Sequence, residues 1–159
     1  MITQQIAKQV REVYFGGNWT CSNLKDNLAG VTWQQATQQV HHFNTIATLV
    51  YHINYYVSAV LKALQGETFS SNDKYSFEHP PINSPEDWDM MLNHTWADAE
   101  KFAHLIEQLP DSQLWEIFID PKYGTYYRNL QGIVEHAHYH LGQIALIKKI
   151  IAEHALSNG

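Results

Sequence analysis

An apolar stripe with helical spacing runs through residues 43–64 and restricts the fold more than any other feature of the chain. Its members are separated by alternating steps of three and four residues: Phe43, Ile46, Val50, Ile53, Val57, Val60 and Leu64. Such steps place all of these side chains on one face of an α-helix, which must then be buried against other helices. Asn44 or Thr45 is placed to cap this helix, and Gly66 to end it.

Three further segments have helical patterns. They are residues 2–14, a segment that starts after Ser84 and stops before Pro110, and residues 129–154. Ser84 is a favourable N-cap because its hydroxyl can accept a hydrogen bond from a free backbone N–H of the first turn. We therefore predict an all-α protein with a four-helix bundle fold.

The four helices account for most of the chain, and no repeat or linker divides it. Residues 1–159 are therefore predicted to form a single domain. The connection at residues 66–83 has a length that is uncommon in compact domains and often functional. Residues 111–127 fit either a short helical turn or a strand.

Composition excludes several classes of protein. The formal net charge is −6, and no basic stripe is present, so we predict that the protein does not bind nucleic acid. Cys21 is the only cysteine, which excludes an intramolecular disulfide and a cysteine-rich zinc site. The N-terminal residues lack an apolar signal core, and no apolar run is long enough to span a membrane. We expect a cytoplasmic protein that does not enter a membrane.

Three histidines lie within five residues of the last predicted helix, and their spacing separates them into two groups. His136 and His140 are four residues apart, so they project from one face of the helix about one turn apart. Two imidazoles at this spacing can bind one divalent metal ion. His138 lies about 200° around the helix from His136 and cannot join them.

His52 is the candidate for a third ligand. It lies in the middle of the helix predicted at 43–64, on a stripe that borders the core. If that helix is the neighbour of the last one, three imidazoles meet inside the bundle and leave coordination positions open, as in catalytic sites. From spacing alone, structural roles for these histidines stay open, since a lone histidine is more often a core or surface residue.

Other common metal and nucleophile sites are not supported. A di-iron centre of the ferritin type requires Glu-x-x-His motifs that face the bundle, and the chain has none. The His-Glu-x-x-His signature of metalloproteases is also absent. Cys21 lies in a polar connector without features that would activate its thiol.

Two segments of the chain resemble the DinB-like (YfiT-like) superfamily of metal-binding helical bundles. They are Thr45–Ile53, which contains His52, and Val134–Ile144, which contains His136 and His140. The resemblance implies that these three histidines hold a metal ion. The run His140-Leu141-Gly142-Gln143 matches the family pattern as well.

The resemblance also implies a cofactor and a set of activities. We expect a divalent metal ion, zinc or nickel before iron or copper, because imidazole suits all four. Relatives of this kind suggest a thiol-dependent S-transferase that acts on a small-molecule thiol, and a metal-dependent hydrolase follows by the same logic. The alternative is a non-catalytic metal-binding module with a structural or interaction role.

Self-association is predicted on two grounds. The resemblance implies a homodimer. The surplus of aromatic residues and the low charged fraction of 16% suggest a buried face between two copies. The tryptophans considered for this face are Trp19, Trp33, Trp88, Trp96 and Trp115.

Several residues near the histidines have candidate supporting roles. Gln143 could bond a metal ligand or a dimer partner, or be a structural amide. Tyr56 could donate a hydrogen bond to a metal-bound group or pack in the core. Gly142 is predicted to allow close approach of another helix, His79 could reach over the site from its loop, and Arg128 is the best positive charge for an anionic substrate.

Overall fold

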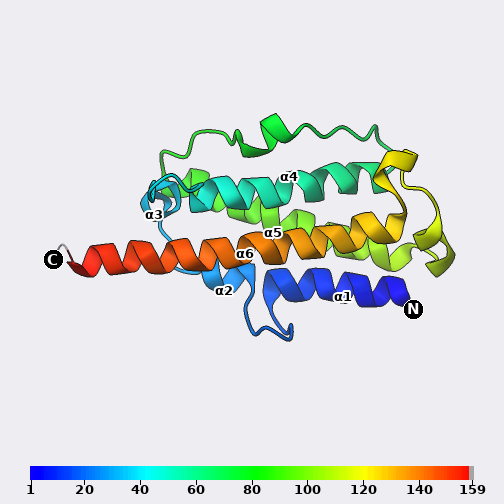
Figure 1. Cartoon of the computed structure of the whole chain (residues 1–159), viewed down its shortest axis with the longest axis horizontal. Helices are drawn as coiled ribbons and strands as arrows, with labels where there is room; N and C mark the ends of the chain where they lie inside the picture. Colours follow the sequence, from blue (N-terminus) through cyan, green and yellow to red (C-terminus); the bar gives the residue numbers. More distant parts are fainter. Residues whose placement is uncertain (158–159) are drawn as a thin grey trace.

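Four long α-helices pack lengthwise around one apolar core in the computed structural model, which describes residues 1–157 (Figure 1). They are α1 (Ile2–Phe15), α4 (Ile46–Leu64), α5 (Pro85–Gln108) and α6 (Tyr126–Ser157). Helix α5 contacts both α1 and α4, and α6 contacts the same two helices. The predicted all-α class is confirmed, because the described residues contain an isolated bridge between Ile117 and Thr125 but no strand.

Short helical elements fill the connections between the long helices. Two are α-helices, α2 (Leu24–Leu28) and α3 (Trp33–Thr37), and three are 3₁₀ turns, η1 (Asp73–Phe77), η2 (Asp111–Trp115) and η3 (Pro121–Tyr123). The ambiguous stretch at 111–127 thus contains two 3₁₀ turns, and both residues of the isolated bridge, Ile117 and Thr125, lie within it. No helix within residues 1–157 is both long and apolar enough to cross a membrane.

The starts of α4 and α5 follow the predicted caps. The Thr45 side chain accepts a hydrogen bond from the backbone N–H of Thr48, and Ser84 accepts one from Asp87. Because α4 begins only at Ile46, Phe43 lies outside it and is 50% exposed, so its place in the core stripe was wrongly predicted. Helix α6 begins earlier and ends later than the predicted residues 129–154.

Helices α4 and α5 run in the same direction, which requires a long return connection between them. Figure 1 shows residues 65–84 travelling back along α4 before α5 begins. The parallel register is visible in the polar contacts. Asn54 Nδ2 lies 3.0 Å from both His94 Nδ1 and Asp98 Oδ2, and Ser58, one turn later, donates to the same Asp98 oxygen at 2.6 Å.

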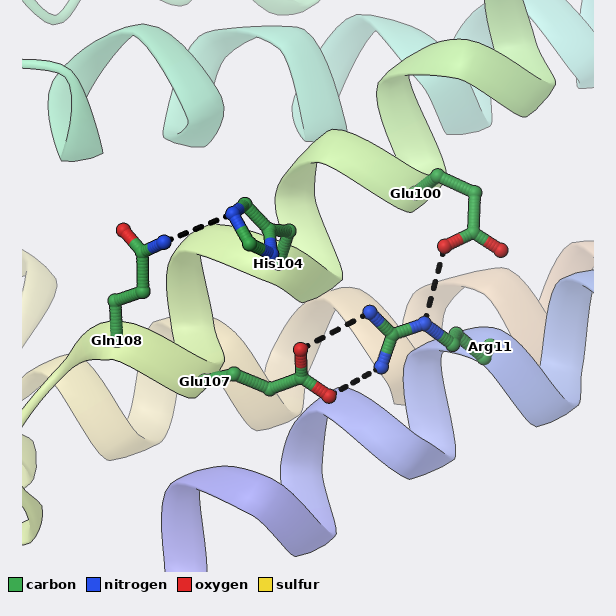
Figure 2. Close-up of polar contacts among 5 residues, drawn as sticks. All are labelled: Arg11, Glu100, His104, Glu107 and Gln108. Carbon is green, nitrogen blue, oxygen red and sulfur yellow. Dashed lines mark hydrogen bonds and ion pairs between the residues drawn. The ribbon is translucent and has the colours of Figure 1, made fainter.

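An ion-pair network joins α1 to α5 (Figure 2). Arg11 Nε donates to Glu100 Oε2 at 3.0 Å, and its two terminal nitrogens donate to the two carboxylate oxygens of Glu107. These two acids raise the pKa of the Arg11 guanidinium above its ordinary value. A bidentate arginine pair of this kind has defined geometry, so it fixes how α1 lies along α5.

Three of the five tryptophans are buried in the core of the chain or pack against it. Trp88 is buried, and its indole N–H donates to the backbone oxygen of Val31 at 2.9 Å, while Trp33 and Trp96 pack against the core. Trp19 and Trp115 are 97% and 59% exposed. The tryptophan surplus therefore argues less strongly for self-association than the sequence suggested, and the homodimer stays a prediction.

Candidate functional site

The three candidate histidines meet at one point between α4 and α6. His136 Nε2 lies 3.0 Å from His52 Nε2 and 3.0 Å from His140 Nε2. The ligand atoms of all three lie within 4.8 Å of one another. We call these three residues the histidine triad. A site of three imidazoles requires the helices that carry His52 and the other two histidines to be neighbours, and α4 and α6 are in contact.

The position of each histidine on its helix directs its side chain toward the interior of the bundle. His52 lies in the middle of α4 and is 6% exposed, and His140 lies on α6 and is 7% exposed. His136, one turn before His140, is half-buried. It lines a pocket together with His52, so this part of the triad can be reached by another molecule.

The imidazole of His52 is held in a single tautomer. The Ser76 hydroxyl donates its proton to the backbone oxygen of Asp73 at 2.7 Å, so Ser76 Oγ can only accept from His52 Nδ1, at 2.9 Å. The Nδ1 atom of His52 therefore carries the proton, and its Nε2 lone pair points into the triad. Metal-binding histidines are oriented in the same way, by a hydrogen bond from the distal ring nitrogen.

The imidazole of His140 is oriented by its own helix. Its Nδ1 lies 2.6 Å from Gln143 Oε1, and a carbonyl oxygen can only accept a hydrogen bond. The Nε2 lone pair of His140 therefore points at the same place as that of His52. Gln143 thus bonds a candidate ligand, which is one of the roles that the sequence predicted for it.

The histidine triad is electrically neutral at physiological pH. Burial lowers the pKa of all three imidazoles, because a charged ring is poorly solvated there. The effect is largest for His136, whose pKa falls to about 4 through burial and the proximity of His140 and His52. Neutral imidazoles are the form that binds metal ions.

The geometry of the triad fits a divalent metal ion. Nitrogen atoms around a tetrahedral ion with bonds of about 2.0–2.1 Å lie about 3.4 Å apart. The separations in the triad are 3.0 Å for the two pairs that include His136 and at most 4.8 Å for the third, so small side-chain shifts bring all three to this value. Three imidazoles, with no fourth ligand grouped with them among residues 1–157, leave at least one coordination position for another molecule.

The 3₁₀ turn η1 covers the triad and is a part of the site that the sequence did not predict. The Phe77 ring stacks on His52, with centroids 3.9 Å apart and an interplanar angle of 15°. From the same turn, Ser76 orients His52, and Asp73 accepts a hydrogen bond from the Tyr56 hydroxyl. The η1 segment has no recognisable sequence motif. The unusual length of the connection at residues 66–83 was the one feature of the sequence that indicated a functional role.

A pocket of about 580 Å³ opens beside the triad. Its lining combines two of the histidines with aromatic and polar side chains: His52, Tyr56, Val60, Phe69, Ser71, Asp73, Phe77, Tyr123, Arg128, Asn129, Gly132, Ile133 and His136. This volume is in the range of small-molecule sites. Tyr56 packs against the edge of the core and also lines this pocket. Arg128, which the sequence indicated as the positive charge for an anionic substrate, lines it as well.

Burial raises the pKa of Tyr56, and the hydrogen bond to Asp73 raises it further, to about 12. Tyr56 therefore stays protonated at neutral pH. Its ring lies edge-on to His52 and His136, with centroids 5.2 Å and 5.1 Å away. The phenol is a hydrogen-bond donor at the border of the triad, and its proton is directed to Asp73.

Several other predicted residues lie outside the site. His138 Nδ1 contacts the backbone oxygen of Val134, on a different face of α6. His79 lies beside Tyr51, with its Nδ1 facing the backbone oxygen of Pro80, so it does not reach over the triad. The prediction for Gly142 was wrong, because a Cβ atom there would meet nothing within 4 Å, and no helix approaches closely.

Comparison with known proteins identifies one family. The sequence model of the DinB superfamily matches residues 11–144, which include α4, η1, α5 and the part of α6 that carries the histidines. Comparisons with curated proteins and with solved structures give no significant match.

The lowered pKa values predict how the stability of the metal-free protein depends on pH. Between about pH 4 and pH 6.5 the unfolded chain binds more protons at His136 than the folded chain does. The free energy of unfolding should therefore rise with pH in this range and level off above it. Because solvent reaches part of the triad, we expect a contribution of about 1–2 kcal/mol.

Urea unfolding at several pH values, with a chelator present, measures this dependence. The variant His136→Gln lacks the titrating group but retains a polar side chain, so its slope in the same range should be smaller. Equal slopes for the two proteins would contradict the prediction.

Proposed function

The chain belongs to the DinB superfamily, and we propose that it is a metal-dependent enzyme in which His52, His136 and His140 hold one divalent ion. The observation that carries the proposal is the orientation of two buried imidazoles. Ser76 and Gln143 hold His52 and His140 in the tautomers whose Nε2 lone pairs converge. A proton on His136 Nε2 can satisfy only one of these two lone pairs at a time, whereas a metal ion at the point of convergence can accept both.

We propose zinc or nickel as the ion. Neutral imidazole is a good ligand for both, and the absence of a cysteine or carboxylate in the triad gives no preference for a softer or harder metal. Three protein ligands leave a position for a substrate, as in catalytic zinc sites.

The reaction proposed is transfer of a small-molecule thiol to an electrophile. A divalent ion lowers the pKa of a thiol or water bound to it and so supplies a nucleophile at neutral pH. In the transfer, the thiol gives its proton to solvent, the sulfur forms a new bond to carbon, and the leaving group departs with the electron pair of the bond that breaks. The aromatic side chains of Phe69, Phe77 and Tyr123 in the lining favour an organic substrate.

Hydrolysis is the second candidate reaction, and one observation makes it less favourable. An attacking water must give up a second proton, usually to a general base. Asp73 is the one carboxylate that lines the pocket within residues 1–157, and it accepts the hydrogen bond of Tyr56. A thiol has one proton to lose and does not need this base.

Metal content gives the first test. Protein reconstituted with Zn²⁺ or Ni²⁺ and then desalted should carry one ion per chain by elemental analysis. His52→Ala, His136→Ala and His140→Ala should each weaken binding at least 100-fold, because each removes a ligand. His138→Ala is the matched control on the same helix and should retain the ion. Full metal content in the His136→Ala and His140→Ala variants would rule out the site.

The hydrogen bonds that orient the ligands are expected to contribute to metal affinity. Ser76→Ala and Gln143→Leu should each weaken Zn²⁺ binding about 10-fold, measured by competition with a chromophoric chelator. Gln108→Leu removes a similar contact, between Gln108 and His104 on α5 (Figure 2), and should leave the affinity unchanged. Equal affinities for all three variants would show that Ser76 and Gln143 do not orient metal ligands.

Thiol transfer is tested with model substrates. The metal-loaded protein should accelerate the reaction of small thiols with monobromobimane, and the acceleration should vanish in His136→Ala and after chelation. Hydrolysis of a p-nitrophenyl ester, measured in parallel without thiol, tests the second candidate. Metal binding without either activity, combined with unfolding when the metal is removed, would favour the non-catalytic structural module instead.

A further inference from the structure

The pocket beside the histidine triad has a charge that differs from that of the whole chain. The chain has a formal net charge of −6, yet the pocket lining contains one cationic side chain, Arg128, and one carboxylate, Asp73. The Tyr56 hydroxyl already donates to that carboxylate. With a divalent ion in the triad, the pocket would be net positive, which favours an anionic molecule.

Arg128 has no carboxylate partner of its own. Within residues 1–157 the ion pairs involve Lys8, Arg11 and His94, and none involves Arg128. It also lies in the first turn of α6, where the positive end of the helix dipole adds to its charge. An exposed guanidinium that lines a pocket and lacks a partner is available to a ligand.

The turn before α6 holds this arginine in place. A Cβ atom at Gly124 would lie 2.8 Å from Arg128 Cδ, so the arginine side chain packs directly over the glycine. Asn129 Nδ2 donates to the backbone oxygens of Tyr123 and Thr125, at 3.0 Å and 2.8 Å, and fixes the turn on which Arg128 rests. A positioned guanidinium loses less conformational freedom when it binds a ligand than a free one does.

His52 and His136 of the triad line the same pocket as Arg128. His136 and Arg128 are eight residues apart on α6, about 12 Å along the helix axis, with Gly132 and Ile133 between them in the lining. Phe69, Phe77 and Tyr123 supply aromatic walls. A ligand that reaches both the triad and Arg128 therefore needs a reactive group, an apolar body and an anionic end.

We infer that the substrate which reacts at the histidine triad is an organic carboxylate with an apolar or aromatic body, and that Arg128 binds its carboxylate. The inference rests on the proposed function, because it takes the triad as the reacting end. A single planar guanidinium matches a carboxylate through two parallel hydrogen bonds, whereas a phosphate group is usually held by several donors. Arg128 is thus a specificity-determining residue.

The test uses Co²⁺-loaded protein and two thiol probes of the same shape. The probes are 4-(mercaptomethyl)benzoate, which carries a carboxylate, and 4-(mercaptomethyl)benzamide, which is neutral. The sulfur-to-cobalt charge-transfer absorption reports binding of each probe. The unaltered protein should bind the carboxylate about 10-fold more tightly than the amide. Arg128→Gln should remove this difference and leave the amide affinity unchanged.

Lys122→Gln is the matched control. Lys122 is a neighbouring cation that lies over the Tyr123 ring, 4.8 Å from its centroid, and does not line the pocket. This variant should keep the preference for the carboxylate. Circular dichroism and cobalt content verify that Arg128→Gln folds and retains the ion.

The outcomes separate the inference from the function on which it rests. Equal affinity for the two probes in the unaltered protein, or a preference that survives in Arg128→Gln, would overturn the role of Arg128 and leave the proposed thiol chemistry intact. Bound cobalt without a charge-transfer band for either probe would overturn the thiol chemistry itself, and the inference with it.

Discussion

Buried imidazoles need hydrogen-bond partners, and this requirement organises the structure around the histidine triad. A ring nitrogen that loses water without gaining a partner costs free energy comparable to a lost hydrogen bond. His52 obtains its partner from Ser76 in η1, and His140 obtains one from Gln143 on its own helix. Both contacts use the outer ring nitrogens, so the inner ones are left to face each other. The same contacts that make burial possible therefore prepare the triad for a metal ion.

The parallel arrangement of α4 and α5 explains where η1 comes from. Two parallel neighbours cannot be joined by a short turn, so residues 65–84 must return along the whole length of α4 (Figure 1). The return path passes over His52 and brings Asp73, Ser76 and Phe77 to the site. A connection that topology makes necessary thus supplies one wall of the pocket and the hydrogen bond that orients a candidate ligand.

The accuracy of the sequence-based predictions varied with the range of the interactions on which they depended. The starts of α4 and α5 were predicted well, because the caps Thr45 and Ser84 each act on a backbone group three residues away. Phe43 was placed in the core because its spacing fits the stripe, but the cap at Thr45 leaves it outside the helix. Gly142 was assigned to a close helix contact that is not there, since a glycine alone does not say what approaches it.

The sequence by itself determined the all-α class, the helical faces and the pairing of His136 with His140, because each follows from residues within a few turns of one helix. It also indicated His52, through a stripe that borders the core. Only the tertiary structure brought His52 to the pair, placed η1 over all three, and put Arg128 in the same pocket as the triad. These are contacts between segments far apart along the chain, and they depend on which helices are neighbours and on the direction in which each one runs.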